Sequence, residues 1–163
     1  MSDTDAANLP SENESIRIDA APAKVWQLVT AMERYGEWSS ENTGGRWRKG
    51  ADGELGTGKV GDQFVGVNRR DGVEWKALVE IVERDEGRSF AFVTGGSELN
   101  FVLWQYLLEP EGEGTRLTEY WELRNLSPIM VENGEPEVAY RMANMRESMR
   151  ATLEGIKRTA ESQ

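Results

Sequence analysis

Turn signals recur at short intervals in the middle of this chain and constrain its fold more than any other feature. Segments of alternating apolar and polar residues are separated by Asp71–Gly72, Glu86–Gly87, Gly95–Gly96 and Pro110–Gly114. Short alternating segments joined by tight turns form antiparallel hairpins. The sequence therefore predicts a meander of consecutive strands over Gln63–Arg69, Val73–Glu83, Arg88–Thr94, Leu99–Glu109 and Thr115–Leu123.

Helical patterns flank this meander. Between Glu137 and Ala160, apolar side chains at steps of three and four form one stripe, made of Val138, Met142, Met145, Met149, Leu153 and Ile156. Near the start, a short strand is expected over Glu14–Asp19, and Pro22 opens a shorter amphipathic helix. A second helical piece is expected around Glu33–Trp38, and the glycine-rich residues 39–61 should form a long loop with at most one short strand.

These elements predict an α+β fold. A curved antiparallel sheet of six to seven strands wrapped around the long C-terminal helix buries the apolar faces of both with the fewest parts. The length of 163 residues suits one domain that needs neither disulfides nor metal. Residues 1–13 hold almost nothing that could be buried, so we expect a disordered tail there, followed by a domain over residues 14–163.

The composition narrows the possible functions. The chain has six tryptophans but no histidine and no cysteine, so it lacks an imidazole base, a thiolate nucleophile and the best ligands for transition metals. We expect no metal site and no cofactor. The residues are suited to enclosing an apolar molecule, because each tryptophan can bury a large flat surface and still donate one hydrogen bond.

Charge and hydropathy bear on partners and location. The net charge of −10 disfavours binding to nucleic acid or to an anionic membrane. No apolar run approaches the roughly 18 residues that a membrane span requires, so no membrane insertion is expected. The acidic, polar start MSDTDAANLPSENES lacks the features of a signal peptide. A cytoplasmic protein is therefore expected.

The order of several short segments resembles a known family. They are I-R-I-D-A-A-P-A-K-V-W (Ile16–Trp26), F-V-G-V-N-R-R-D-G (Phe64–Gly72) followed by Trp75, E-G-R-S-F-A-F (Glu86–Phe92), W-Q-Y-L-L-E-P (Trp104–Pro110) and T-R-L-T-E (Thr115–Glu119). Together they resemble the START-like, or SRPBCC, superfamily with the helix-grip fold, and within it the polyketide cyclase/dehydrase-like branch of actinobacteria. The likeness covers about residues 14–160. Because this fold hosts lipid carriers, hormone receptors, cyclases and dioxygenase subunits, it does not define a reaction.

The resemblance implies a cavity between the concave face of the sheet and the long helix. We expect a volume of roughly 300 Å³ or more, the size usual for ligand pockets. Candidate ligand-binding residues are the polar Asn68, the inward aromatic side chains Trp75, Phe90, Phe92 and Trp121, and the helix methionines Met142, Met145 and Met149. Trp104 and Tyr106 are further candidates, but both faces of Leu99–Leu108 are apolar and the sequence does not decide which of them lines the cavity. Gln105 is a further candidate for a polar contact. The alternative is a solid core in which these side chains only pack against one another.

Glu119 is the most distinctive candidate. In Thr115–Leu123 one strand face reads Leu117, Glu119, Trp121 and Leu123, so a single carboxyl lies among apolar side chains. Loss of hydration there should raise its pKa and suit it to proton transfer, with Tyr106 or Asn68 polarising a substrate carbonyl. The alternative is a hydrogen-bonded structural carboxylate, or a bulge that reverses the faces.

Three functions are compatible with these observations. The first is the binding of a small hydrophobic or aromatic ligand, such as a lipid or a polyketide-like compound, in the internal cavity. The second is a polyketide aromatase/cyclase or dehydratase that uses Glu119 as general acid or base. The third is a protein-interaction module without a ligand. Both faces of Leu99–Leu108 are apolar, which suggests a homodimer that covers the outer face.

Overall fold

The computed structural model describes residues 9–162, so most of the predicted disordered tail, residues 1–8, lies outside the described residues. The sheet contains β1 (Ser11–Ile18), β2 (Asn42–Trp47), β3 (Gln63–Arg70), β4 (Val73–Asp85), β5 (Ser89–Thr94), β6 (Val102–Glu111) and β7 (Gly114–Leu123). The helices are α2 (Pro22–Val29), the 3₁₀ helix η1 (Met32–Glu37), α3 (Gly96–Leu99), α4 (Pro128–Asn133) and α5 (Glu135–Glu161).

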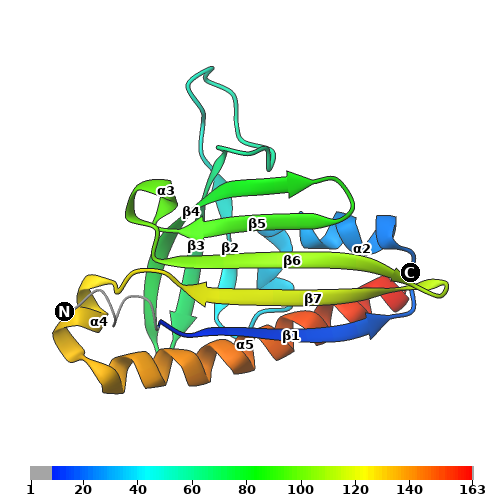
Figure 1. The fold of residues 1–163 in the computed structure, drawn as a ribbon. Helices are drawn as coiled ribbons and strands as arrows, with labels where there is room; N and C mark the ends of the chain where they lie inside the picture. Colours follow the sequence, from blue (N-terminus) through cyan, green and yellow to red (C-terminus); the bar gives the residue numbers. More distant parts are fainter. Residues whose placement is uncertain (1–8, 163) are drawn as a thin grey trace.

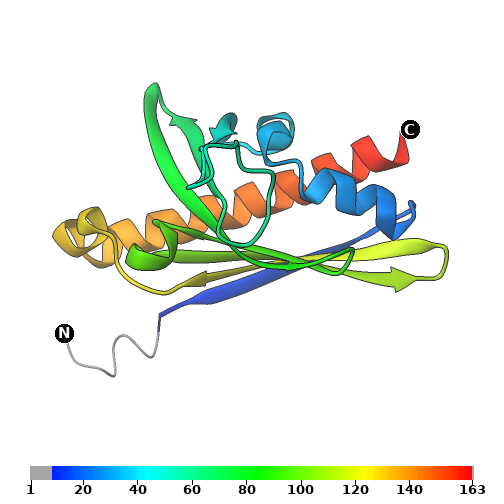
Figure 2. The same cartoon turned by 90° about the horizontal axis from the view of Figure 1, so that it is seen from above.

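The seven strands form one antiparallel sheet in the order β1-β7-β6-β5-β4-β3-β2. Five of them follow one another as the predicted meander, while β1 and β2 form the two edges (Figure 1). The sheet is curved, and α5 runs along its concave side with α2 and η1 beside it (Figure 2). The predicted fold class, a curved sheet gripping a long C-terminal helix, is confirmed.

Strand β1 begins three residues earlier than predicted. Ser11, Glu12 and Asn13 pair with Glu122, Trp121 and Tyr120 of β7, so these residues belong to the sheet and not to a tail. The prediction failed because an edge strand needs few apolar residues when its backbone is paired on one side. Glu12 and Glu14 instead form ion pairs with Arg146 and Arg150 of α5, at 2.7 and 2.8 Å, which fasten the helix to this edge.

Strand β4 contains a bulge that sequence alternation did not reveal. The register with β5 shifts between Ile81 and Glu83, so Arg84 comes to lie opposite Phe90 on the concave face. Strict alternation along this strand, without a bulge, would put Arg84 on the outer face with Glu80. A bulge inserts one extra residue and reverses every side chain beyond it.

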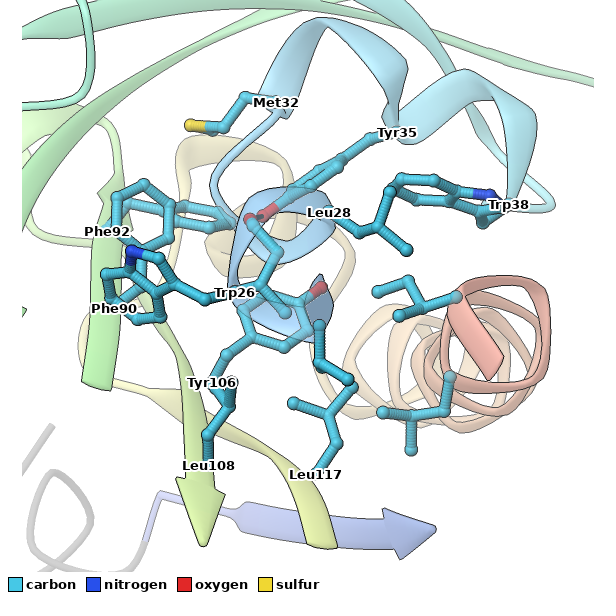
Figure 3. Packing of buried hydrophobic residues seen from close by; sticks show 14 of the residues in the cluster. Trp26, Leu28, Met32, Tyr35, Trp38, Phe90, Phe92, Tyr106, Leu108 and Leu117 are labelled. Atoms are coloured by element: carbon cyan, nitrogen blue, oxygen red, sulfur yellow. Dashed lines mark hydrogen bonds between the residues drawn. The ribbon is translucent and has the colours of Figure 1, made fainter. Parts of the chain in front are cut away.

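The concave face is filled at one end and hollow at the other. At the filled end, α2 and η1 pack Trp26, Leu28 and Trp38 against Phe90 and Leu117 of the sheet (Figure 3). The ring of Trp26 meets Phe90 edge to face, with centroids 6.2 Å apart. Burial of these aromatic side chains supplies much of the apolar contact that stabilises the fold.

The outer face of β6 is less apolar than the sequence suggested. Leu99 belongs to α3 and Phe101 precedes the strand, so the large apolar side chains on the outer face of β6 are Leu103 and Leu107. Leu103 joins a small cluster with Ala91 and Val93. Beside this cluster Gln105 donates to Glu83 at 2.7 Å and to Ser89 at 3.0 Å. These polar side chains lie beside the apolar cluster on the outer face of the sheet. The homodimer that would cover this face stays a prediction.

Candidate functional site

A cavity of about 600 Å³ lies between the concave face of the sheet and α5. This volume falls within the range of roughly 300–1,000 Å³ that is usual for ligand pockets. Eight of the predicted site residues line it, namely Asn68, Trp75, Phe92, Trp104, Tyr106, Glu119, Trp121 and Met145. Because β6 contributes Trp104 and Tyr106, the even-numbered face of this strand is the one turned toward the cavity. Contact of these residues with a ligand stays a prediction.

Three of the predicted residues lie elsewhere. Phe90 is fully buried at the filled end, where Trp26 and Arg84 cover it, so it does not line the cavity. Met149 is also fully buried and, with the half-buried Met142, belongs to the packing of α5 against Trp121. The predicted contacts of these three with a ligand are therefore corrected to roles in the core. Gln105 points to the outer face.

The helix presents a different stripe to the cavity from the one predicted. Its lining residues are Arg141, Asn144, Met145, Ser148 and Thr152, which recur at steps of three and four and so share one face. Met142 and Met149 of the predicted apolar stripe lie next to this face and pack against β7. The polar residues of the cavity face repeat with the same helical period as the apolar stripe. Sequence reasoning missed them because polar residues on a helix are normally expected on its solvent-exposed face.

Glu119 lies in the wall of the cavity, in β7 directly opposite Tyr106 of β6. It is 2% exposed. The hydroxyl of Tyr106 donates to Oε2 of Glu119 at 3.2 Å, while Oε1 is buried without a hydrogen-bond partner among the described residues. Burial raises the pKa of this carboxyl to about 8, and the hydrogen bond from Tyr106 opposes part of that rise. Glu119 is therefore mostly protonated at neutral pH.

The charges near Glu119 also favour the protonated, uncharged form of its carboxyl. Glu14 of β1 lies directly opposite on the other side, and like charges in such a pair would destabilise the sheet. Glu14 is neutralised by Arg150, whereas the described residues include no cation paired with Glu119.

Tyr35 is a second phenol in the cavity wall that sequence reasoning did not identify. It comes from η1 and is buried, and its hydroxyl donates to the backbone carbonyl of Val29. Its ring lies 6.1 Å from that of Tyr106, centroid to centroid (Figure 3). Burial raises the pKa of both phenols well above the usual value, so both stay protonated and act as hydrogen-bond donors.

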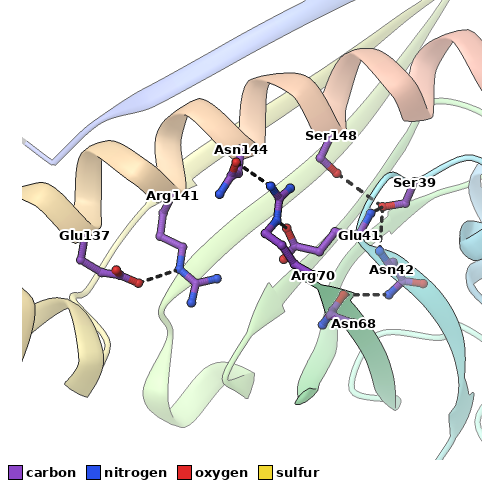
Figure 4. A network of polar contacts seen from close by, with 9 residues as sticks. All are labelled: Ser39, Glu41, Asn42, Asn68, Arg70, Glu137, Arg141, Asn144 and Ser148. Atoms are coloured by element: carbon purple, nitrogen blue, oxygen red, sulfur yellow. Dashed lines mark hydrogen bonds and ion pairs between the residues drawn. The ribbon is translucent and has the colours of Figure 1, made fainter. Parts of the chain in front are cut away.

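A polar network joins the strands to the helix at the side of the cavity (Figure 4). Arg70 of β3 donates to Glu41 at 3.1 Å and to Asn144 of α5 at 2.8 Å. Next to this cluster, Asn42 donates to Asn68 at 3.4 Å. From the sequence alone, a charge in the glycine-rich residues 39–61, such as Glu41, is most simply read as solvated. The structure instead places it in the cavity lining, because residues 42–47 form an edge strand that brings the preceding loop to the helix.

No group of three or more acidic residues among residues 9–162 is arranged to hold a metal ion. None of the described helices is long and apolar enough to cross a membrane.

Comparison with known proteins places this cavity in a family. Residues 11–161 match the family model for polyketide cyclase/dehydrase and lipid transport proteins. The chain belongs to this family. The resemblance inferred from the sequence is therefore confirmed. A search of curated proteins finds no match.

Solved structures of family members and more distant proteins share the fold. A polyketide-cyclase-like protein from Corynebacterium glutamicum is 28% identical, with a TM-score of 0.63 over 93% of this chain and 91% of that one. The protein TTHA0849 from Thermus thermophilus is 21% identical, with a TM-score of 0.70 over 94% and 98%. The di-domain ARO/CYC StfQ of the steffimycin biosynthetic pathway is 12% identical, and this chain covers 53% of it with a TM-score of 0.76. At identities this low the last two show the fold alone.

Proposed function

We propose that this protein binds one small hydrophobic or aromatic molecule, lipid or polyketide-like, in the cavity beneath α5. One observation carries the proposal. Glu119 lines the cavity, and its Oε1 is buried and has no hydrogen-bond partner in the described structure. An unsatisfied buried polar atom is costly, and a ligand that supplies a hydroxyl or carbonyl at this point removes that cost.

The rest of the wall supports the same class of ligand. Four large aromatic side chains contribute to it from four different strands, namely Trp75, Phe92, Trp104 and Trp121. Such surfaces fit flat or chain-like apolar molecules and give little discrimination by charge. The neutral carboxyl of Glu119 and the hydroxyl of Tyr106 would orient the polar group of the ligand.

Calorimetric titration with 1-decanol and with 2-naphthol tests this proposal. Each probe combines an apolar body with one hydroxyl, and we expect saturable binding of one molecule per chain. Ala77→Phe, which adds a ring to the cavity wall, should abolish binding, while Ala143→Phe adds the same ring at an exposed position of α5 and should leave it intact. Equal binding by both variants, or no binding by the unmodified protein, would contradict the proposal.

A second candidate function is catalysis by the same site. It is favoured by the Glu119 pKa of about 8, because a general base works best when its pKa lies near the working pH. In a cyclisation or dehydration of a poly-β-keto chain, the Glu119 carboxylate would remove a proton next to a carbonyl while Tyr106 hydrogen-bonds the developing enolate oxygen. The enolate carbon would attack a second carbonyl of the chain, and protonated Glu119 would give its proton to the alkoxide that this bond formation creates. In the dehydration that follows, the carboxylate would remove a second proton next to the carbonyl and then donate it to the departing hydroxyl, which leaves as water.

Glu119→Gln separates catalysis from binding. Incubation with an N-acetylcysteamine thioester of a poly-β-keto acid, followed by mass spectrometry, should show loss of water with the unmodified protein and none with the variant. Because the amide retains the shape of the carboxyl, affinity for the thioester should change little. Turnover that survives in the variant would eliminate Glu119 as the acid or base.

A further inference from the structure

Arg141 is an ionised side chain in the cavity wall whose donors are only partly used. It lies on the stripe of α5 that faces the cavity, and its side chain is 33% exposed. Its Nε donates to Glu137 at 3.0 Å, and its guanidinium carbon lies 5.6 Å from the centre of the Trp75 ring. The ion pair and the contact with Trp75 together hold the guanidinium group in one orientation.

The two terminal nitrogens of Arg141 have no hydrogen-bond partner within residues 9–162 (Figure 4). Arg70, the other arginine of this network, donates hydrogen bonds from its Nε to Glu41 and from its Nη1 to Asn144. Glu41 is thus paired with Arg70, and Glu137 with Arg141. Arg141 therefore keeps both of its terminal nitrogens as donors, whereas Arg70 uses one of its two on Asn144.

The part of the cavity wall around Glu119, by contrast, offers no ionised partner for a charge among the described side chains. Glu119 is mostly protonated at neutral pH, and the side chains around it are aromatic. An ionised group that entered this region would lose its hydration without compensation. A charged end of a ligand must therefore stay near Arg141, where solvent is still accessible.

We infer that the ligand ends in an anionic oxygen group, a carboxylate or a phosphate, and that Arg141 binds this group at the partly exposed side of the cavity. The terminal nitrogens of arginine form a planar fork that matches two oxygens of such an anion. The apolar body then points inward, toward Glu119. This inference rests on the proposed function, since it names the class of molecule that the cavity holds.

Calorimetry at pH 7 with four ten-carbon probes tests the inference. They are decanoate, decyl phosphate, 1-decanol and decyltrimethylammonium, which differ in the charge of one end. A charge-assisted pair of hydrogen bonds predicts that at least one of the two anions binds about tenfold more tightly than 1-decanol. A preference for decanoate points to a carboxylic acid as the ligand, and a preference for decyl phosphate points to a phosphate monoester.

Arg141→Gln should remove the preference for the anion, so that this variant binds the anion and 1-decanol with similar affinity. Arg150→Gln is the matched control, because it deletes the same charge from the same helix but at a side chain that pairs with Glu14 of β1. Arg141→Lys keeps the charge without the planar fork, so part of the preference should remain. Circular dichroism confirms that each variant is folded.

Two results would overturn the inference. One is equal binding of 1-decanol and both anions, or tighter binding of decyltrimethylammonium, by the unmodified protein. The other is an equal loss of anion preference in Arg141→Gln and Arg150→Gln, which would show a general effect of charge. Failure of all four probes to bind would instead contradict the proposed function itself, so the two failures are distinguishable.

Discussion

At the scale of single residues, Glu119 determines the chemistry of the cavity. Its carboxyl lies in an aromatic wall, one oxygen is hydrogen-bonded by Tyr106 and the other has no partner in the described structure. Loss of hydration therefore outweighs the single hydrogen bond, and the pKa rises to about 8. This buried carboxyl lowers the stability of the fold. Ionisable groups with such perturbed pKa values are typical of binding and catalytic sites.

The raised pKa makes stability depend on pH. In the unfolded chain a glutamic acid titrates at about 4.3, so between about pH 4 and about pH 8 the folded state retains a proton that the unfolded state has released. The free energy of unfolding should therefore fall as pH rises through this window. Glu119→Gln should remove this dependence and raise the free energy of unfolding at pH 7 by on the order of 2 kcal/mol.

Urea denaturation across this pH range measures the effect. Glu113→Gln, in the exposed turn between β6 and β7, serves as control and should leave the pH dependence unchanged. If Glu119→Gln instead destabilises the protein at pH 7, the carboxyl is an ionised structural anion and its proposed role is wrong.

Tyr106 should act on Glu119 in a measurable way. Tyr106→Phe removes the hydroxyl that donates to Oε2, so the ionised carboxyl loses its stabilising hydrogen bond and its pKa should rise further. The lost bond should lower stability by about 1 kcal/mol at neutral pH. Carbon-13 NMR titration of the Glu119 carboxyl reports the pKa directly, and an unchanged or lowered value would show that Tyr106 does not hydrogen-bond it.

At the scale of elements, the sequence predicts strands and helices well because their periodicity reflects which side is buried. The strand Gly114–Leu123 and the helix Glu135–Glu161 were found to within two residues, and Glu119 was placed on the buried face. The bulge in β4 was missed because no pattern marks an inserted residue. The cavity lining of α5 was missed because Arg141 and Asn144 resemble a solvated face until the sheet is placed opposite them.

The packing of α5 against η1 depends on Gly155. A Cβ at this position would lie 2.6 to 2.8 Å from the side chain of Trp38, which is closer than atoms in van der Waals contact. Gly155→Ala should therefore destabilise the protein by about 1–3 kcal/mol, although alanine is the better helix former. Chemical denaturation measures this, with the exposed Glu154→Ala expected to be neutral or slightly stabilising. A more stable Gly155→Ala variant would show that α5 is not in close contact with Trp38 at this position.

At the scale of the whole molecule, the sheet and α5 enclose a volume instead of packing solidly. Helices α2 and η1 fill one end of the concave face, while the stretch lined by Trp75, Trp104 and Trp121 stays open for a ligand. A ligand that binds only the folded state should stabilise it by mass action. At a concentration one hundred times its dissociation constant, 2-naphthol should raise the free energy of unfolding by roughly 2.7 kcal/mol, measurable as a rise in Tm. Unchanged Tm at that ratio would contradict binding to the folded state alone.

Native mass spectrometry of the protein purified from its own source tests the central claim most directly. We predict a complex of one chain with one small organic molecule, which dissociates on collisional activation and is absent from the Ala77→Phe variant prepared in the same way. A bare chain in both preparations, or the same adduct in both, would contradict the account of a ligand enclosed between the sheet and α5.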